Sequence, residues 1–83
     1  MTKVQKLLSK AFNNPSGLLF REFETILSQS GWTFDRQQGS HSIWYSPAGF
    51  RLPIQQRQDG KAKGYQVKQF LEQYGKENRD GQI

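Results

Sequence analysis

Cysteine is absent from this sequence of 83 residues. Its absence excludes disulfide bonds, a thiolate nucleophile and a cysteine-based zinc site. Because disulfides are rare in the cytosol, a chain without cysteine is consistent with that compartment. The length predicts a single small domain, residues 1–83, near the size at which burial alone only just stabilises a fold.

Long apolar runs are also missing. Charged and polar residues interrupt the segment Met1–Leu8, so it lacks the apolar centre of a signal peptide. No segment approaches the roughly 18 apolar residues of a membrane-spanning helix. We therefore expect a cytoplasmic protein without a membrane partner.

Acidic residues are few, with seven Asp and Glu against twelve Lys and Arg. Among them are Glu22, Glu24, Asp35 and Asp59. Their spacing does not predict a cluster of carboxylates of the kind that holds a divalent metal. We expect no metal site and no cofactor.

The net charge of +5 comes from one part of the chain. Between residues 36 and 68 a single acid, Asp59, opposes six basic residues, whereas the charges elsewhere balance. The six are Arg36, Arg51, Arg57, Lys61, Lys63 and Lys68. A local basic field attracts phosphate backbones, although an ordinary solvated surface has the same composition.

Apolar residues at helical spacing predict three helices, over about residues 3–12, 19–30 and 65–74. The breakers Asn13–Gly17 close the first helix, and Gly31 and Gly75 end the second and third. We expect residues 76–83 to be a frayed tail.

Between the second and third helices the apolar period changes to 2, which predicts strands over residues 32–38, 41–46 and 50–55. Pro53 cannot donate to a ladder, so it favours an edge strand or a bulge. Residues 56–64 are polar and are expected to form a loop. The predicted fold class is α+β in the order α-α-β-β-β-α, an antiparallel three-stranded sheet with helices on one face.

Six aromatic side chains are expected to build most of the core: Phe20, Phe23, Phe34, Trp44, Phe50 and Phe70. Alternation along the second strand separates Trp44 from His41 and Tyr45. If Trp44 is buried, the other two share the open face, where Tyr45 can stack on a base.

The only histidine, His41, follows the turn residues Gly39 and Ser40 and begins the second strand. Histidine is the side chain best suited to take up and release protons near neutrality. With no cysteine and few acids in the chain, His41 is the candidate catalytic residue. The alternative is a histidine that serves only as a turn or surface residue.

A helix ending in Gly31-Trp32, a strand, then Gly39-Ser40-His41 and an aromatic-rich strand together resemble the HicA toxins. The segment Gly64–Glu72 is similar to the last helix of longer HicA-like proteins, which also carry an extra N-terminal helix ending in a breaker such as Asn14-Pro15. The resemblance covers about residues 4–74. Many relatives carry further histidines where this chain has Ser46-Pro47 and Gln55-Gln56, so His41 is its lone imidazole.

This resemblance implies a double-stranded-RNA-binding-domain-like fold and a type II toxin–antitoxin role. It implies an endonuclease that cleaves mRNA without a metal, uses His41 and is neutralised by a HicB-like antitoxin. Expected substrate-binding residues are the turn and the nearby basic and aromatic positions: Gly39, Ser40, Arg36, Tyr45, Arg57, Lys61, Lys63 and Lys68. Two alternatives remain open, a non-catalytic RNA-binding module of the same fold and a protein-interaction domain whose basic face binds an acidic partner.

Overall fold

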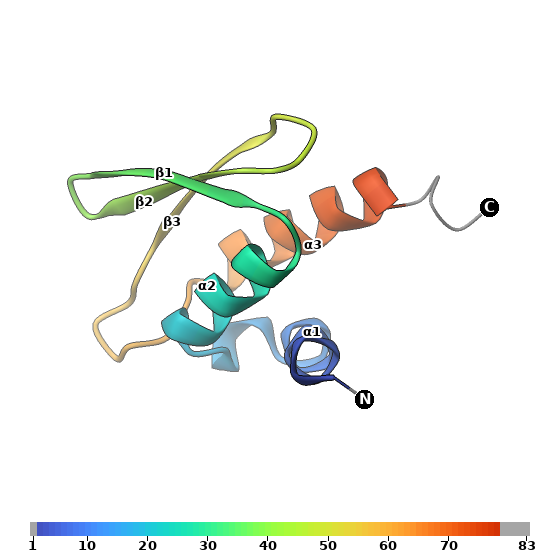
Figure 1. Ribbon diagram of the computed structural model, residues 1–83. Coiled ribbons are helices and arrows are strands. Elements are labelled where there is room, and N and C mark those ends of the chain that lie inside the picture. Colours follow the sequence, from blue (N-terminus) through green and yellow to red (C-terminus); the bar gives the residue numbers. More distant parts are fainter. Residues whose placement is uncertain (1, 79–83) are drawn as a thin grey trace.

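A computed structural model describes residues 2–78 of the chain. The elements follow the order α1 (Lys3–Asn13), a short 3-10 turn (Pro15–Gly17), α2 (Phe20–Gln29), β1 (Thr33–Gln38), β2 (His41–Tyr45), β3 (Arg51–Gln55) and α3 (Gly64–Asn78). The three strands form one antiparallel sheet in the order β1-β2-β3. Figure 1 shows α2 and α3 under one face of this sheet and α1 beyond α2. The predicted α+β order and the double-stranded-RNA-binding-domain-like arrangement are confirmed.

The two N-terminal helices begin with side chains that satisfy backbone N–H groups. Thr2 and Gln5 form a capping box at the start of α1, each side chain accepting from the other residue's N–H. At α2, the Glu22 carboxylate accepts the Leu19 N–H at 2.9 Å. The same Glu22 oxygen accepts from Lys10 of α1 at 2.9 Å, so one carboxylate joins the two helices.

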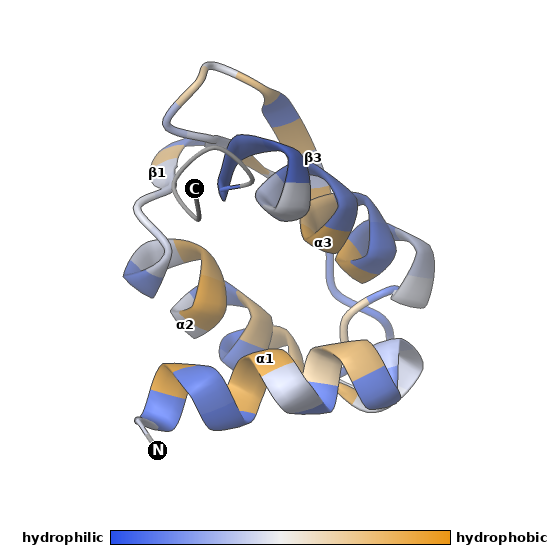
Figure 2. Ribbon diagram, turned by 90° about the vertical axis from the view of Figure 1, so that its right-hand side faces the viewer, coloured by the Kyte–Doolittle hydropathy of each residue, from blue (hydrophilic) through white to orange (hydrophobic). Residues whose placement is uncertain are grey.

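The helices bury their apolar stripes against one another and against the sheet. Figure 2 shows apolar and polar residues alternating around each helix. Phe70 of α3 lies at the centre, with its ring centroid 5.8 Å from that of Phe23 and 5.2 Å from that of Trp32. Leu52 and Ile54 of β3 complete this core from the sheet. The predicted core positions of Phe23, Trp44 and Phe70 are confirmed.

The prediction of a core position is wrong for two of the six aromatic residues. Phe34 is 48% exposed and Phe50 is 38% exposed. Phe34 lies on β1, an edge strand whose six residues are all exposed, and its ring touches only the margin of the core at Trp44. Phe50 precedes β3 in a turn and packs edge-on against Trp32. Phe20 is half-buried at the core margin.

The expected end of the last helix is also wrong, because α3 continues through Gly75 to Asn78. Glu77 accepts from the N–H of Ala48 in the β2–β3 turn and from the Gln73 amide, which holds the last turn against the sheet. Lys76 to Asn78 are therefore helical rather than frayed, and the rest of the expected tail, residues 79–83, lies outside the described residues.

A β-bulge breaks the alternation of β1. Phe34 pairs with Trp44 and Arg36 pairs with Ile43, so Asp35 has no partner across the ladder. Residues paired directly across an antiparallel ladder share a face. Phe34 therefore faces the helices and Arg36 faces away from them, whereas uninterrupted alternation placed both on the same side.

Candidate functional site

The loop between β1 and β2 is a two-residue turn made of Gly39 and Ser40. Gly39 has a φ of +62°, which side-chain-bearing residues rarely adopt and which tight hairpins require. This turn pairs Gln38 with His41, so His41 is fixed as the first residue of β2. The histidine side chain is half-buried.

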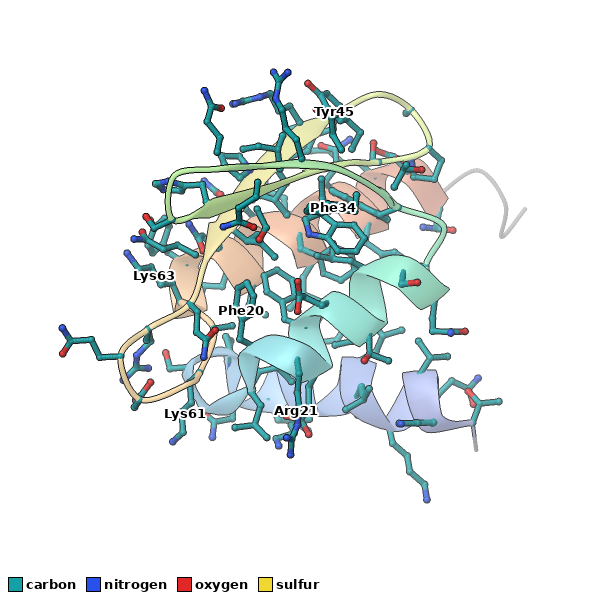
Figure 3. The ribbon with its side chains drawn as sticks, turned by 60° about the vertical axis from the view of Figure 1, so that its left-hand side comes forward. Phe20, Arg21, Phe34, Tyr45, Lys61 and Lys63 are labelled. Carbon is teal, nitrogen blue, oxygen red and sulfur yellow. The ribbon has the colours of Figure 1, made fainter. Side chains whose placement is uncertain are left out.

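The register of the sheet decides what lies beside His41. Three cross-strand rows form the face that the helices leave uncovered: Thr33–Tyr45–Arg51, Arg36–Ile43–Pro53 and Gln38–His41–Gln55. We call these nine residues the outer face. Figure 3 shows Tyr45 pointing away from the helices and Phe34 pointing towards them. The expected placement of His41 and Tyr45 on one open face agrees with this register, and the bulge at Asp35 brings Arg36 to the same face.

Arg51 and Gln55 also belong to the outer face, although neither was among the predicted site residues. Leu52 and Ile54 are buried, so the alternating residues of β3 had to point outwards. That alternation was the signal that could have found both residues.

A shallow depression of about 240 Å³ lies on the outer face. His41 and Gln38 line one end, Arg51 lines the other, and Ile43 and Pro53 lie between them. Ile43 is only 1% exposed, so the depression has an apolar floor between an imidazole and a guanidinium. Such a surface suits a ligand that combines negative charge with an apolar or aromatic part.

Gln55 links the glycine-serine turn to the loop that precedes α3. Its side-chain amide donates to Ser40 Oγ at 2.9 Å, and its carbonyl accepts from Lys63 Nζ at 2.7 Å. The Gln55 N–H donates to the side chain of Gln66, which is buried in α3. These bonds hold an ammonium group next to the turn that carries His41.

The other predicted basic residues lie apart from the outer face. The 56–63 loop is anchored beside the start of α2, where Gly60 accepts from the Phe20 N–H and Arg57 donates to the Ser16 carbonyl. Arg57 also forms an ion pair of 2.7 Å with Asp59. Figure 3 shows Lys61 on the helix side of the molecule, far from Tyr45. Lys68 is exposed on α3.

Within residues 2–78, no group of three or more His, Cys, Asp or Glu side chains is placed to hold a metal ion. In the same range, no helix combines the length and the apolar character needed to cross a membrane.

Residues 20–76 match a family model described as the HicA toxin of bacterial toxin–antitoxin systems. The chain belongs to the HicA toxin family. The match runs from the start of α2 into the last turns of α3 and includes the outer face, whereas α1 precedes it. No curated protein and no solved structure matches the chain. As a HicA family member, the protein is a toxin of a toxin–antitoxin system, and an antitoxin is its partner.

Proposed function

We propose that this HicA toxin is an mRNA endonuclease of a type II system, and that it cleaves RNA without a metal through His41. The observation that carries the proposal is the sheet register, which gathers His41, Tyr45 and two arginines on the face of the sheet opposite α2 and α3. An RNA strand on this face meets cations for its phosphates and an aromatic ring for a base. We place the reaction in the cytoplasm, where mRNA is translated.

RNA carries its own nucleophile, the 2′-hydroxyl, so the protein needs to move protons and offset charge. His41 accepts the proton of the 2′-hydroxyl as the bond from O2′ to phosphorus forms. The bond from phosphorus to O5′ then breaks, O5′ takes a proton from water, and the hydroxide that remains takes the proton held by His41. Proton transfer by a positioned side chain contributes about 10²–10⁴-fold to a rate.

Two neighbouring groups support this step. The Lys63 ammonium, held by Gln55 beside the turn, offsets the charge that develops on the phosphorane oxygens. Gly39 has no neighbouring atom within 4 Å of where a Cβ would stand, so the backbone of the turn is open to a phosphate. The same basic face suits an acidic surface of a HicB-like antitoxin, which would then exclude RNA.

The test is cleavage of single-stranded RNA by wild type and His41→Ala in the presence of a chelator. We expect wild type to cut and His41→Ala to lose cutting while keeping its fold and its affinity for RNA. Gln69→Ala is the control, because Gln69 is exposed on α3 and lies outside the outer face. Cleavage by His41→Ala at the wild-type rate would sink the proposal.

A second function, RNA binding without cleavage, is favoured by one observation: His41 is the only imidazole in the chain. A single imidazole cannot act as base and acid at the same moment. If wild type binds RNA on the outer face and cuts none, the protein is a binding module that shares the HicA fold. If it binds no RNA at all, the remaining alternative is a basic surface used only for an acidic protein partner.

A further inference from the structure

A groove of about 530 Å³ lies on the other side of β1 from the outer face, between β1 and α2. Arg21, Glu24 and Ser28 of α2 line one wall, and the rings of Phe34 and Trp44 line the other. None of these residues belongs to the outer face, so the groove is separate from the His41 site.

Trp44 lines this groove and carries an unused hydrogen-bond donor. The side chain is only 7% exposed, and its indole nitrogen is buried without a hydrogen-bond partner among the described residues. A buried N–H group without an acceptor is costly, and such groups are rare in folded proteins. An acceptor supplied by a ligand in the groove would satisfy it once the indole ring turned to bring the N–H to the surface.

Glu24 brings an unused acceptor. Burial raises the pKa of this carboxyl group above its ordinary value. No hydrogen bond or ion pair to Glu24 occurs within residues 2–78 to compensate. A ligand that presents N–H groups would offset the loss of hydration.

Phe34 brings an open aromatic ring. It is 48% exposed and packs edge-on against Trp44, with ring centroids 5.6 Å apart. An edge-on contact leaves the face of the phenylalanine ring free for stacking. One groove is therefore lined by an indole with an unused donor, a carboxyl group with an unused acceptor and an aromatic ring open to stacking.

We propose that this groove binds one nucleobase of single-stranded RNA and prefers guanine. The base stacks on Phe34, guanine O6 accepts from the Trp44 indole N–H, and guanine N1–H and N2–H donate to the Glu24 carboxylate. Adenine and cytosine carry an amino group where guanine has O6, so they offer no acceptor at that point. The inference rests on RNA being the substrate of this toxin, as proposed above.

Two observations favour a nucleobase over an extended peptide added to β1. The bulge at Asp35 interrupts the exposed edge of β1, and bulges of this kind obstruct pairing with another strand. Basic side chains also lie on both sides of the strand, with Arg21 in the groove and Arg36 on the outer face. An RNA strand that crosses this edge meets a guanidinium on each side for its phosphates.

The experiment follows the two indole N–H resonances of ¹⁵N-labelled full-length protein while each of the four nucleoside 5′-monophosphates is added. We expect GMP to move the Trp44 resonance downfield, as a new hydrogen bond would, and to leave Trp32 in place as an internal control. Phe34→Ala should weaken GMP binding about tenfold or more, because stacking on an aromatic ring carries much of the affinity for a base. Phe50→Ala is the matched control, since Phe50 is another exposed ring packed edge-on against a tryptophan.

Glu24→Gln provides a second test that does not remove a ring. It should abolish the preference for GMP over AMP while the Trp32 resonance reports an unchanged fold. A Trp44 resonance that stays in place with all four nucleotides would overturn the inference. So would one that moves only when a partner protein is bound, which would make the groove a protein-docking surface.

Cleavage is measured separately, so the two proposals can fail independently. If wild type cuts RNA but Trp44 never moves, the groove inference fails and the proposed function stands. If GMP binds in the groove and no RNA is cut, the proposed function fails and the nucleobase site remains.

Discussion

Gln55, the last residue of β3, connects the Gly39-Ser40 turn to the 56–63 loop through its side-chain hydrogen bonds. Its side chain spans Ser40 Oγ and Lys63 Nζ, so the position of the ammonium depends on the amide. Gln55 is half-buried and lies outside the apolar core, so we expect a substitution there to leave the protein folded. A residue of this kind acts as a positioning residue for the charge beside His41.

We predict that Gln55→Leu lowers RNA cleavage about tenfold, because Lys63 is no longer held at the turn. Lys63→Ala should cause a similar loss, and the double variant should be little worse than either single variant, since both remove one shared interaction. Rates and unfolding midpoints are measured for all four proteins. Fully additive losses would show that Gln55 and Lys63 act separately, and Lys68→Ala serves as a control for the loss of a lysine elsewhere.

Gly39 is constrained by its backbone rather than by its surroundings. Its φ is +62°, and a Cβ there would meet nothing within 4 Å. We predict that Gly39→Ala destabilises the fold by about 1 kcal/mol, the cost of a left-handed conformation, and that Gly39→Asn costs less. Urea unfolding measures both. Equal stability of all three proteins would mean that the turn relaxes to another conformation at no cost.

For single residues, side-chain orientation could be predicted from the sequence where the alternation of a regular strand was undisturbed. Burial of Trp44 and alternation in β2 were enough to place His41 and Tyr45 on one face. The same rule failed in β1, because a bulge is a local insertion that a period of 2 does not reveal. The hydrogen bonds of Gln55 were also beyond prediction, since they join residues from three separate segments.

Among the helices, α1 is the one that the family match does not include, and Glu22 attaches it to the rest of the fold. Burial by itself raises the pKa of Glu22. The opposing effects are larger: Glu22 accepts hydrogen bonds from Lys10 and the Leu19 N–H, and the positive charges of Lys10 and Arg21 favour its ionised form. The net result is a lowered pKa. A carboxyl group with a lowered pKa in the folded state stabilises the fold above its unfolded pKa. That contribution is lost as the pH falls through the folded pKa.

We predict that Glu22→Gln lowers the free energy of unfolding by about 1 kcal/mol at neutral pH, by removing an ion pair and weakening a cap. The difference from wild type should shrink as the pH falls below about 4.5, the unfolded value. Unfolding at several pH values measures this. Glu72→Gln is the control, because its pair with Lys76 is exposed and should contribute little. A difference that stays constant with pH would contradict the prediction.

The bounds of the elements were predictable within a few residues wherever a local signal ended them. The glycine after α2, Gly31, has a φ of +87° and stops that helix as expected. Gly75 follows its predicted helix in the same way but does not have a positive φ. The helix continues past it, and the Ala48 N–H donates to Glu77 in the added turn. Which glycine ends a helix was therefore decided by contacts between distant segments.

Over the whole molecule, the positive charge that is concentrated in residues 36–68 is spread over several places, with Lys63 beside the turn and Lys68 on α3. Arg36 and Arg51 lie on the outer face with His41, whereas Arg57 and Lys61 lie in the loop beside the start of α2. The sequence located the charge along the chain, but the fold decides which charges meet the same ligand. Substitutions in the outer-face pair and in the loop pair can therefore test separately which of the two binds RNA.

We predict that Arg36→Ala with Arg51→Ala weakens RNA binding strongly and lowers the steepness of its salt dependence. Each lost phosphate contact reduces the slope of log K against log salt by about 0.7 for a single strand, so two contacts reduce it by about 1.4. Arg57→Ala with Lys61→Ala removes the same charge and is the matched control. Its effect should be smaller, because Arg57 and Lys61 lie in the loop beside the start of α2, away from the outer face. Titrations over a range of salt concentrations measure the slopes, with unfolding curves to confirm that both variants fold. A larger change in slope for the loop pair would move the RNA path from the outer face to the start of α2, and His41 would then lie outside it.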